Sequence, residues 1–284
     1  GGIGGDSGGE DYRLGARYDR PATFHPDTGL FLEARIEGND EPDYTESKVE
    51  VGGGFTRVFS DELRGEAGIA YRYSDIDDDL GRRELQHLLF PASLTWDKRD
   101  DALNATSGLF LEVSLTPFIG LDQRSGDGAR IFADARHYRS FGAGDRYTLA
   151  GRAQIGSVAG PSIGEIPADM LFYSGGAGTV RGQDYQSLGV DIAPGVRVGG
   201  RAFVGFSGEF RASVTDKIQG VAFVDTGFVG QDALGTGRGD WHSGAGIGAR
   251  YFTPVGPIRV DIATPLGDRA GEDLELYIGI GQAF

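Results

Sequence analysis

The chain has 284 residues, of which 39% are hydrophobic and 49 are glycine, and it carries a formal net charge of −15. Such acidity argues against a nucleic-acid partner, which would require a basic surface. The absence of cysteine excludes disulfides and thiolate metal sites. No run approaches the roughly 18 apolar residues of a transmembrane helix, so any passage through a membrane would use strands.

Segments of strand length, in which apolar and polar residues alternate, recur along the chain between runs rich in Gly, Asp, Asn and Pro. Their length fits the about 9–11 residues of a membrane-spanning strand better than the about 5–6 residues of a mean soluble strand. No shift in composition marks a second domain. We therefore predict one all-β domain over residues 1–284, with thirteen strands at Asp11–Arg20, Gly29–Gly38, Ser47–Phe59, Leu63–Tyr73, Leu85–Asp97, Gly108–Phe118, Ala129–Phe141, Arg146–Ser157, Arg201–Val214, Lys217–Val229, Trp241–Phe252, Pro257–Pro265 and Asp273–Phe284.

Each alternating segment has one apolar face and one polar face. In the segment 201–214, Phe206 and Phe210 share one face, and Glu209 lies on the other. A soluble β-sandwich would alternate in the same way, with its apolar face inward. Strand length, small residues on the polar face and aromatic residues at segment ends favour a membrane barrel. The terminal aromatics are Trp96, Tyr138, Trp241 and Phe284, and the residues predicted to face lipid are Phe206, Phe210, Val224 and Ile278.

Gap lengths predict an orientation, because outer-membrane barrels combine short periplasmic turns with longer extracellular loops. Short gaps occur at Ser60–Glu62, Gly142–Asp145, Thr215–Asp216 and Thr253–Gly256. Longer gaps, mostly acidic or rich in glycine, occur at Ser74–Glu84, Gly120–Gly128, Val158–Gly200, Gly230–Asp240 and Leu266–Glu272. The longest gap is therefore expected to leave the extracellular rim.

That longest gap contains the stretch SGGAGTVRGQDYQSLG at Ser174–Gly189. A connection of this length in a compact all-β chain is usually disordered or functional, and its composition is not that of a disordered tract. Glycines on both sides of Arg181 let the backbone fold back, so that the arginine would stand at a narrow tip. Taken alone, the stretch is better explained as a glycine-rich turn with an incidental surface arginine, and the rest of the chain changes that balance.

Val180-Arg181-Gly182 resembles the Val-Arg-Gly-aromatic signature of the outer-membrane assembly-factor superfamily, the BamA- and TamA-type surface-antigen β-barrels. The surrounding stretch, from Gly176 to Tyr185 and beyond, is most similar to TamA-type members. Gln183 stands where the family often has an aromatic residue, and Tyr185 is a candidate substitute.

Two further motifs agree with this resemblance. Asp97, Arg99 and Asp100, followed by Gly108, resemble the family's strand-turn-strand element, and the segment 251–266 resembles its penultimate hairpin. The chain also ends in Phe284 after an alternating strand, as the family's C-terminal insertion signal does. That signal would comprise Tyr277, Ile278, Ile280 and Phe284, with the even-numbered residues facing outward.

The resemblance implies a transmembrane antiparallel β-barrel of about sixteen strands, preceded by periplasmic POTRA domains, with the loop at about residues 158–200 folded into the lumen. Five predicted strands follow this loop, as in the family, but eight precede it where eleven would be expected. We therefore expect about thirteen strands of the C-terminal part of the barrel, without the first strands and the POTRA domains, and open at the N-terminal edge.

Two carboxylates are expected to anchor Arg181 inside the lumen. Glu209 and Asp225 lie on the lumen-facing parity of the two strands after the loop, about six and nine residues from the Thr215–Asp216 turn. At about 3.3 Å per residue, both lie near the middle of the wall. One guanidinium can bind two carboxylates, which the single ammonium of a lysine would not reproduce. The alternative is a hydrated lumen in which the acids pair with Arg211 or Lys217.

The residues give little support for an enzyme. The histidines lack metal-ligand spacing, and the acidic run at residues 75–79 lacks the glycine and distal glutamate of an EF-hand. The glycines at 175–178 are not followed by the Gly-Lys-Ser/Thr of a phosphate loop. Asp97, Arg99 and Asp100 are better explained as a brace of their turn than as catalytic carboxylates. We predict no enzymatic activity, no cofactor and no metal.

The resemblance implies a factor of the bacterial outer membrane that inserts or secretes β-barrel and autotransporter-type clients. Its partners would be outer-membrane lipid, unfolded client proteins and a TamB-like periplasmic protein. The alternative is an outer-membrane channel, either a porin or a two-partner-type secretion pore. A loop that plugs the lumen favours the assembly factor, because a porin needs an open lumen.

Overall fold

The structure is a computed structural model that describes residues 11–267 and 273–284. Before the long loop, the strands are β1 (Tyr12–Arg20), β2 (Thr28–Glu41), β3 (Tyr44–Val58), β4 (Leu63–Asp78), β5 (Arg83–Leu89), β6 (Ala92–Asp97), β7 (Gly108–Gly120), β8 (Gly128–Phe141) and β9 (Tyr147–Ala159). After it follow β12 (Ala202–Ser213), β13 (Ile218–Gly230), β14 (Gly239–Thr253), β15 (Gly256–Pro265) and β16 (Glu275–Ile280).

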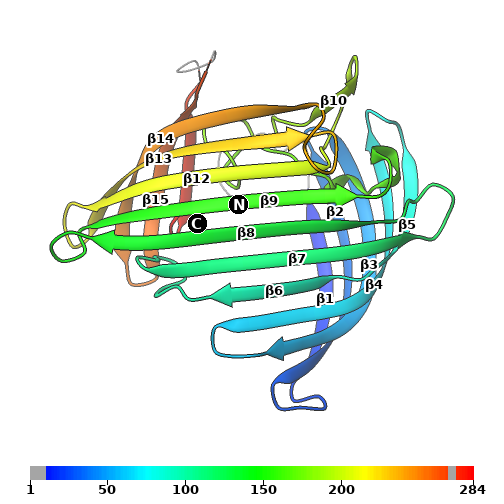
Figure 1. The fold of residues 1–284 in the computed structure, drawn as a ribbon, viewed down its shortest axis with the longest axis horizontal. Coiled ribbons are helices and arrows are strands. Elements are labelled where there is room, and N and C mark those ends of the chain that lie inside the picture. Colours follow the sequence, from blue (N-terminus) through cyan, green and yellow to red (C-terminus); the bar gives the residue numbers. More distant parts are fainter. Residues whose placement is uncertain (1–10, 268–272) are drawn as a thin grey trace.

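These strands form one antiparallel sheet in chain order, in which β5 and β6 together occupy a single place between β4 and β7. Within the described residues, β1 and β16 are the two edges of this sheet. Figure 1 shows a continuous curved wall rather than two packed layers. The all-β fold and its antiparallel topology are therefore as predicted, and the soluble sandwich is excluded.

Apolar side chains cover the outer face of this wall. Phe206, Val224 and Ile278 are 49%, 51% and 43% exposed, whereas Glu209 and Asp225, on the opposite parity, are 2% and 1% exposed. The residues that the alternating pattern predicted to face lipid therefore lie on the outer, convex face of the wall. None of the described helices is long and apolar enough to cross a membrane.

The expected strand limits need two corrections. The acidic run predicted as a loop at Ser74–Glu84 is mostly strand, because Arg82 and Arg83 pair with Asp75 and Asp78 across the β4–β5 turn and offset the acidic charge. The single strand predicted at Leu85–Asp97 is interrupted at Pro91, which has no N–H to donate to the ladder. The register continues across this break, since Leu89 pairs with Ala70 and Ala92 with Ala67.

The predicted aromatic girdle is only half correct. Trp96 and Trp241 lie on the outer face, but Tyr138 and Phe284 are buried on the inner side, where they pack together with Ala105 and Ala150. β16 ends at Ile280, and Gly281 then adopts a φ of 89°, which turns the last residues inward. Phe284 was expected to belong to the last strand and to face outward. Both expectations are wrong, because the strand ends before it and its side chain lies inside.

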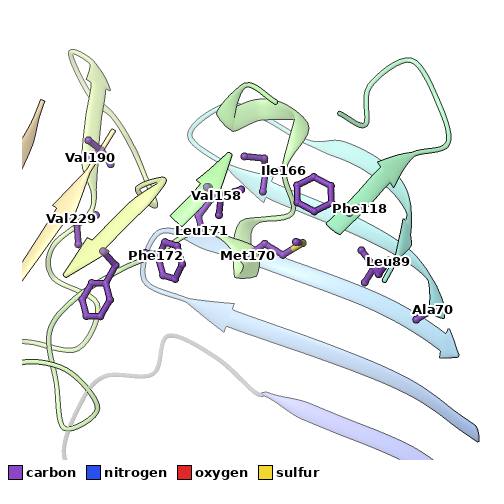
Figure 2. Close-up of a cluster of buried hydrophobic side chains, with 11 residues drawn as sticks. Ala70, Leu89, Phe118, Val158, Ile166, Met170, Leu171, Phe172, Val190 and Val229 are labelled. Carbon is purple, nitrogen blue, oxygen red and sulfur yellow. The ribbon is translucent and has the colours of Figure 1, made fainter. Parts of the chain in front are cut away.

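The connection between β9 and β12, residues 160–201, is called the lumenal loop below. It contains two short 3-10 helices, η1 (Ile163–Glu165) and η2 (Ala168–Met170), and a hairpin of β10 (Val190–Ala193) and β11 (Val196–Val198). Its apolar residues pack on the inner face of the wall. Figure 2 shows Ile166, Met170, Leu171 and Phe172 of the loop beside Ala70, Leu89, Phe118, Val158 and Val229 of the strands.

The expected alternation of short and long gaps holds only from β7 onward. Before it, the ten residues 98–107 lie on the side of the short turns, whereas the β2–β3 and β4–β5 turns on the opposite side have only two and four residues. The turns after β3, β8, β12 and β14 are short. The expected gap at Leu266–Glu272 lies mostly outside the described residues, as do residues 1–10.

Candidate functional site

The tip of the lumenal loop is a tight turn closed by its own backbone. Gly176 N–H donates to the carbonyl of Gln183 at 2.9 Å, and the Thr179 hydroxyl bonds the backbone of Gly175. Gly182 has a φ of 87°, and a Cβ there would lie 2.5 Å from the backbone oxygen of Thr264. The glycine is therefore required both for the turn and for close approach to β15.

The guanidinium of Arg181 binds both carboxylates that were expected to receive it. Its Nε and Nη2 donate to Asp225 at 2.7 and 3.0 Å, and its Nη1 donates to Glu209 at 2.6 Å. The Arg181 backbone N–H also donates to Asp225 at 3.1 Å. The side chain of Arg181 is 3% exposed, and those of Glu209 and Asp225 are 0% and 1% exposed. The contact with Asp225 is bidentate, the geometry that distinguishes arginine from lysine.

The register of two neighbouring strands explains why these acids converge. β12 and β13 pair with Glu209 opposite Phe223 and Ser207 opposite Asp225. Glu209 and Asp225 are therefore diagonal neighbours on the inner face: the residue opposite Asp225 is Ser207, two positions from Glu209 along β12. Phe223 is directly opposite Glu209 and two residues before Asp225 on β13, and the Arg181 guanidinium carbon is 3.6 Å from the centre of its ring. This arrangement adds a cation–π contact to the two ion pairs.

A third carboxylate, which was not predicted from the sequence, completes the site. Asp261 on β15 lies 3.5 Å from Arg181 Nη1 and is itself paired with Arg250 of β14. Glu209 likewise binds Arg211 at 2.8 Å. Arg211, which was considered as a partner of the acids in place of Arg181, thus binds Glu209 together with Arg181. The site is thus a buried network in which Glu209 and Asp261 each contact more than one arginine, whereas Asp225 binds Arg181. Burial would lower the pKa of Arg181, but its hydrogen bonds to Asp225 and Glu209 raise it.

The residues after Arg181 extend the docking to the last strands. Gly182 N–H donates to the hydroxyl of Tyr277 on β16 at 2.9 Å, and the Gln183 amide donates to the carbonyl of Ser243 on β14 at 2.8 Å. Gln183 is buried in the tip, whereas Tyr185 is 45% exposed. Tyr185 therefore does not take the place of an aromatic residue at position 183, since the Gln183 side chain itself fills that buried place.

The strand-turn motif lies apart from Arg181, near the short-turn end of the wall. Arg99 donates to Asp97 at 2.9 and 2.7 Å, and Asp100 accepts from the backbone of Thr106 and Ser107. Gly108 has a φ of 99°, and a Cβ there would lie 2.0 Å from the carbonyl oxygen of Lys98. These contacts are those of a braced turn.

Arg211 connects this turn to the Arg181 network. Its Nη1 donates to the carbonyl of Ala105 at 3.2 Å, and its Nη2 donates to the carbonyl of Phe284 at 3.3 Å. Of the residues expected to form a C-terminal signal, Ile278 and Ile280 face outward, Tyr277 contacts the loop tip, and Phe284 lies inside.

The hydrogen bonds and ion pairs of this site attach the loop tip to the wall. The polar atoms of the site are committed to one another, and no group of three His, Asp or Glu within the described ranges is placed to hold a metal ion. The loop tip contacts β12 through Glu209, β13 through Asp225, β14 through Ser243, β15 through Asp261 and β16 through Tyr277. One short segment thus ties together the last five strands of the sheet.

Comparison with known proteins places this arrangement in a family. A family model described as the Omp85 superfamily domain matches residues 2–284. The fold is similar to that of BamA from Haemophilus ducreyi lacking POTRA domains 1–3, with a TM-score of 0.79 and 15% identity over 95% of this chain and 62% of that chain. CdiB from Acinetobacter baumannii gives a TM-score of 0.56 and 14% identity over 98% of this chain and 57% of that chain.

A curated relative is outer envelope protein 80 of Arabidopsis thaliana, described as chloroplastic. It is 26% identical over 258 residues, which cover 80% of this chain and 32% of the relative. The chain thus spans about a third of the length of this relative and less than two thirds of each of the two solved structures.

Proposed function

Because the chain belongs to the Omp85 superfamily, whose domain matches residues 2–284, we propose that this outer-membrane β-barrel helps client proteins to insert into or cross the membrane. The proposed clients are unfolded β-barrel and autotransporter-type proteins. The surrounding lipid and these clients would be its partners. A TamA-type role with a TamB-like periplasmic protein is the finer form of this proposal, and it rests on the similarity of the residues around Arg181 to TamA-type members.

The observation that carries the proposal is the buried attachment of the lumenal loop. Three carboxylates surround Arg181, and the tip contacts the last five strands. A loop attached in this way occupies the interior, which suits a protein that works through its wall and its strand edges. It does not suit a porin, which needs an open lumen.

We further propose that residues 1–284 are the C-terminal part of a larger protein, with further strands and POTRA domains before them. The sheet has five strands after the lumenal loop and eight strand positions before it, and its two edges, β1 and β16, are not paired with each other within the described residues. Additional strands would close the gap between these edges. The function is proposed to be non-enzymatic, since the buried polar groups are used in docking.

The proposal can be tested by reconstituting the natural full-length protein into liposomes and measuring two properties. The first is the folding rate of an unfolded β-barrel client, followed by its heat-modifiable migration in gels, and the second is ion conductance across a planar bilayer. An assembly factor should accelerate client folding and conduct poorly. High conductance without any effect on client folding would contradict the proposal and support the channel.

A further inference from the structure

The lumenal loop has a second ionic contact, separate from the Arg181 network. Asp169 in η2 accepts a hydrogen bond from Lys48 Nζ at 2.6 Å and another from Arg72 Nη2. Lys48 lies on β3 and Arg72 on β4, near the other end of the sheet. Their side chains are 13% and 7% exposed, and that of Asp169 is 18% exposed. These charges therefore meet largely away from solvent.

The backbone and the neighbouring side chains reinforce this contact. Asp169 N–H donates to Glu46 of β3 at 3.2 Å. Ala168, which is fully buried, packs against Ile76 and Leu85. Removal of one partner from a partly buried ion pair leaves an uncompensated charge, so loss of the Asp169 carboxylate should weaken this attachment of the loop.

The two attachments lie on different parts of the wall. Going from β4 to β12 crosses five inter-strand steps, since β5 with β6, β7, β8 and β9 lie between them. At about 4.8 Å per step, the anchors are separated by roughly 24 Å along the curved wall. Only twelve residues separate Asp169 from Arg181 in sequence. An extended segment of this length can span about 40 Å, so the residues between the anchors, which include Phe172 and Tyr173, can follow the inner face of the wall; Phe172 packs there against Phe203 of β12.

We propose that Asp169 is a positioning residue, a second anchor that ties the lumenal loop to β3 and β4 independently of Arg181. The loop is then a brace held at two points, one on the first strands and one on the last five. Release of either anchor frees its own half of the loop while the other half stays docked. This inference concerns the attachment of the loop and does not depend on the proposed assembly function.

The absence of native cysteines in residues 1–284 allows a direct test with single-cysteine reporters. Ala168→Cys reports on the first half of the loop, and Ser174→Cys, at a residue that is 1% exposed, reports on the second half. The natural full-length protein, with any cysteine outside these residues replaced, is assembled in liposomes and reacted with a small polar maleimide. Only protein that shows the migration of folded barrel is counted.

Asp169→Asn should raise the labelling rate at position 168 at least tenfold and leave position 174 within twofold of the parent. Arg181→Ala should give the opposite pattern. The matched control is Asp191→Asn, the same change at an exposed position of the loop, which should alter neither rate. Lys48→Gln, which removes one of the two cations, should raise labelling at position 168 by a smaller factor and provides the test where Asp169→Asn fails to assemble.

Two outcomes would overturn the inference. One is parental labelling at position 168 in Asp169→Asn or, where that variant does not assemble, in Lys48→Gln. The other is an equal rise at both positions in either variant, because that result would mean that the loop has one cooperative attachment rather than two.

Discussion

Substitution of Gly244 by alanine should expel the tip of the lumenal loop without changing any charge. Gly244 lies on β14, and a Cβ added there would stand 1.9 Å from the carbonyl oxygen of Arg181. Ordinary contact begins at 3.4 Å, so the two groups must separate by about 1.5 Å. β14 is held in hydrogen-bonded ladders with β13 and β15. The loop tip is therefore expected to move rather than the wall.

The cost of this movement can be worked from the contacts of Arg181. A shift of about 1.5 Å lengthens its hydrogen bonds to Asp225 and Glu209, now 2.7 and 2.6 Å, beyond hydrogen-bonding distance. A hydrogen bond to a charged group contributes about 1.5–3 kcal/mol. Loss of two such bonds thus costs at least about 3 kcal/mol, which corresponds to a rise of roughly a hundredfold in the undocked population.

The assay is the labelling rate of Ser174→Cys in the assembled protein, with and without the alanine at position 244. Gly208→Ala is the matched control, because a Cβ at Gly208 on β12 has no atom within 4 Å. The reasoning predicts faster labelling with the first substitution and parental labelling with the second. Parental rates with both would show that the tip does not dock against Gly244.

Arg181→Lys should undock the tip by about 1.5–3 kcal/mol relative to the parent, because one ammonium cannot replace the bidentate pair with Asp225; unchanged labelling of Ser174→Cys would refute this. A lipid-soluble relaxation agent should broaden spin labels at positions 206 and 224 more than at positions 207 and 225, and the reverse order would refute the assignment of the outer face. Burial would raise the pKa of Asp169, but Arg72 and Lys48 lower it. Its docking energy is therefore fully present above the undocked value of about 3.9 and is lost only below that pH. Because Glu46 also contacts Asp169, the assay uses a Glu46→Gln background. Labelling of Ala168→Cys, normalised to denatured protein, should then not change between pH 8 and pH 5, and a rise toward pH 5 would contradict the lowered pKa of Asp169.

The contact between Arg181 and its two acids could be predicted because it depends on regular geometry. The two-residue period of a strand places Glu209 and Asp225 on one face, and a short turn fixes how far each lies along the wall. The glycines around Arg181 give the tip its turn. Asp261 escaped this reasoning because β15 lies two strand positions beyond β13. Only the curvature of the sheet brings it to the same guanidinium.

Other features depend on interactions that alternation does not encode. Phe284 continues the pattern of Ile278 and Ile280, and nothing in that pattern indicates that Gly281 turns the chain inward. The attachment of Asp169 to Lys48 joins residues 121 positions apart, and η2 has no period that would predict its partner. The acidic run after Tyr73 suggested a loop because its arginine partners belong to the next strand.

The most direct test of the docked loop is a structure of the natural full-length protein in a lipid nanodisc. The Arg181 guanidinium should lie within hydrogen-bonding distance of both Glu209 and Asp225, with residues 160–201 inside the wall. A loop that extends outside the barrel, or an Arg181 side chain beyond the reach of a bridging water from both acids, would contradict it.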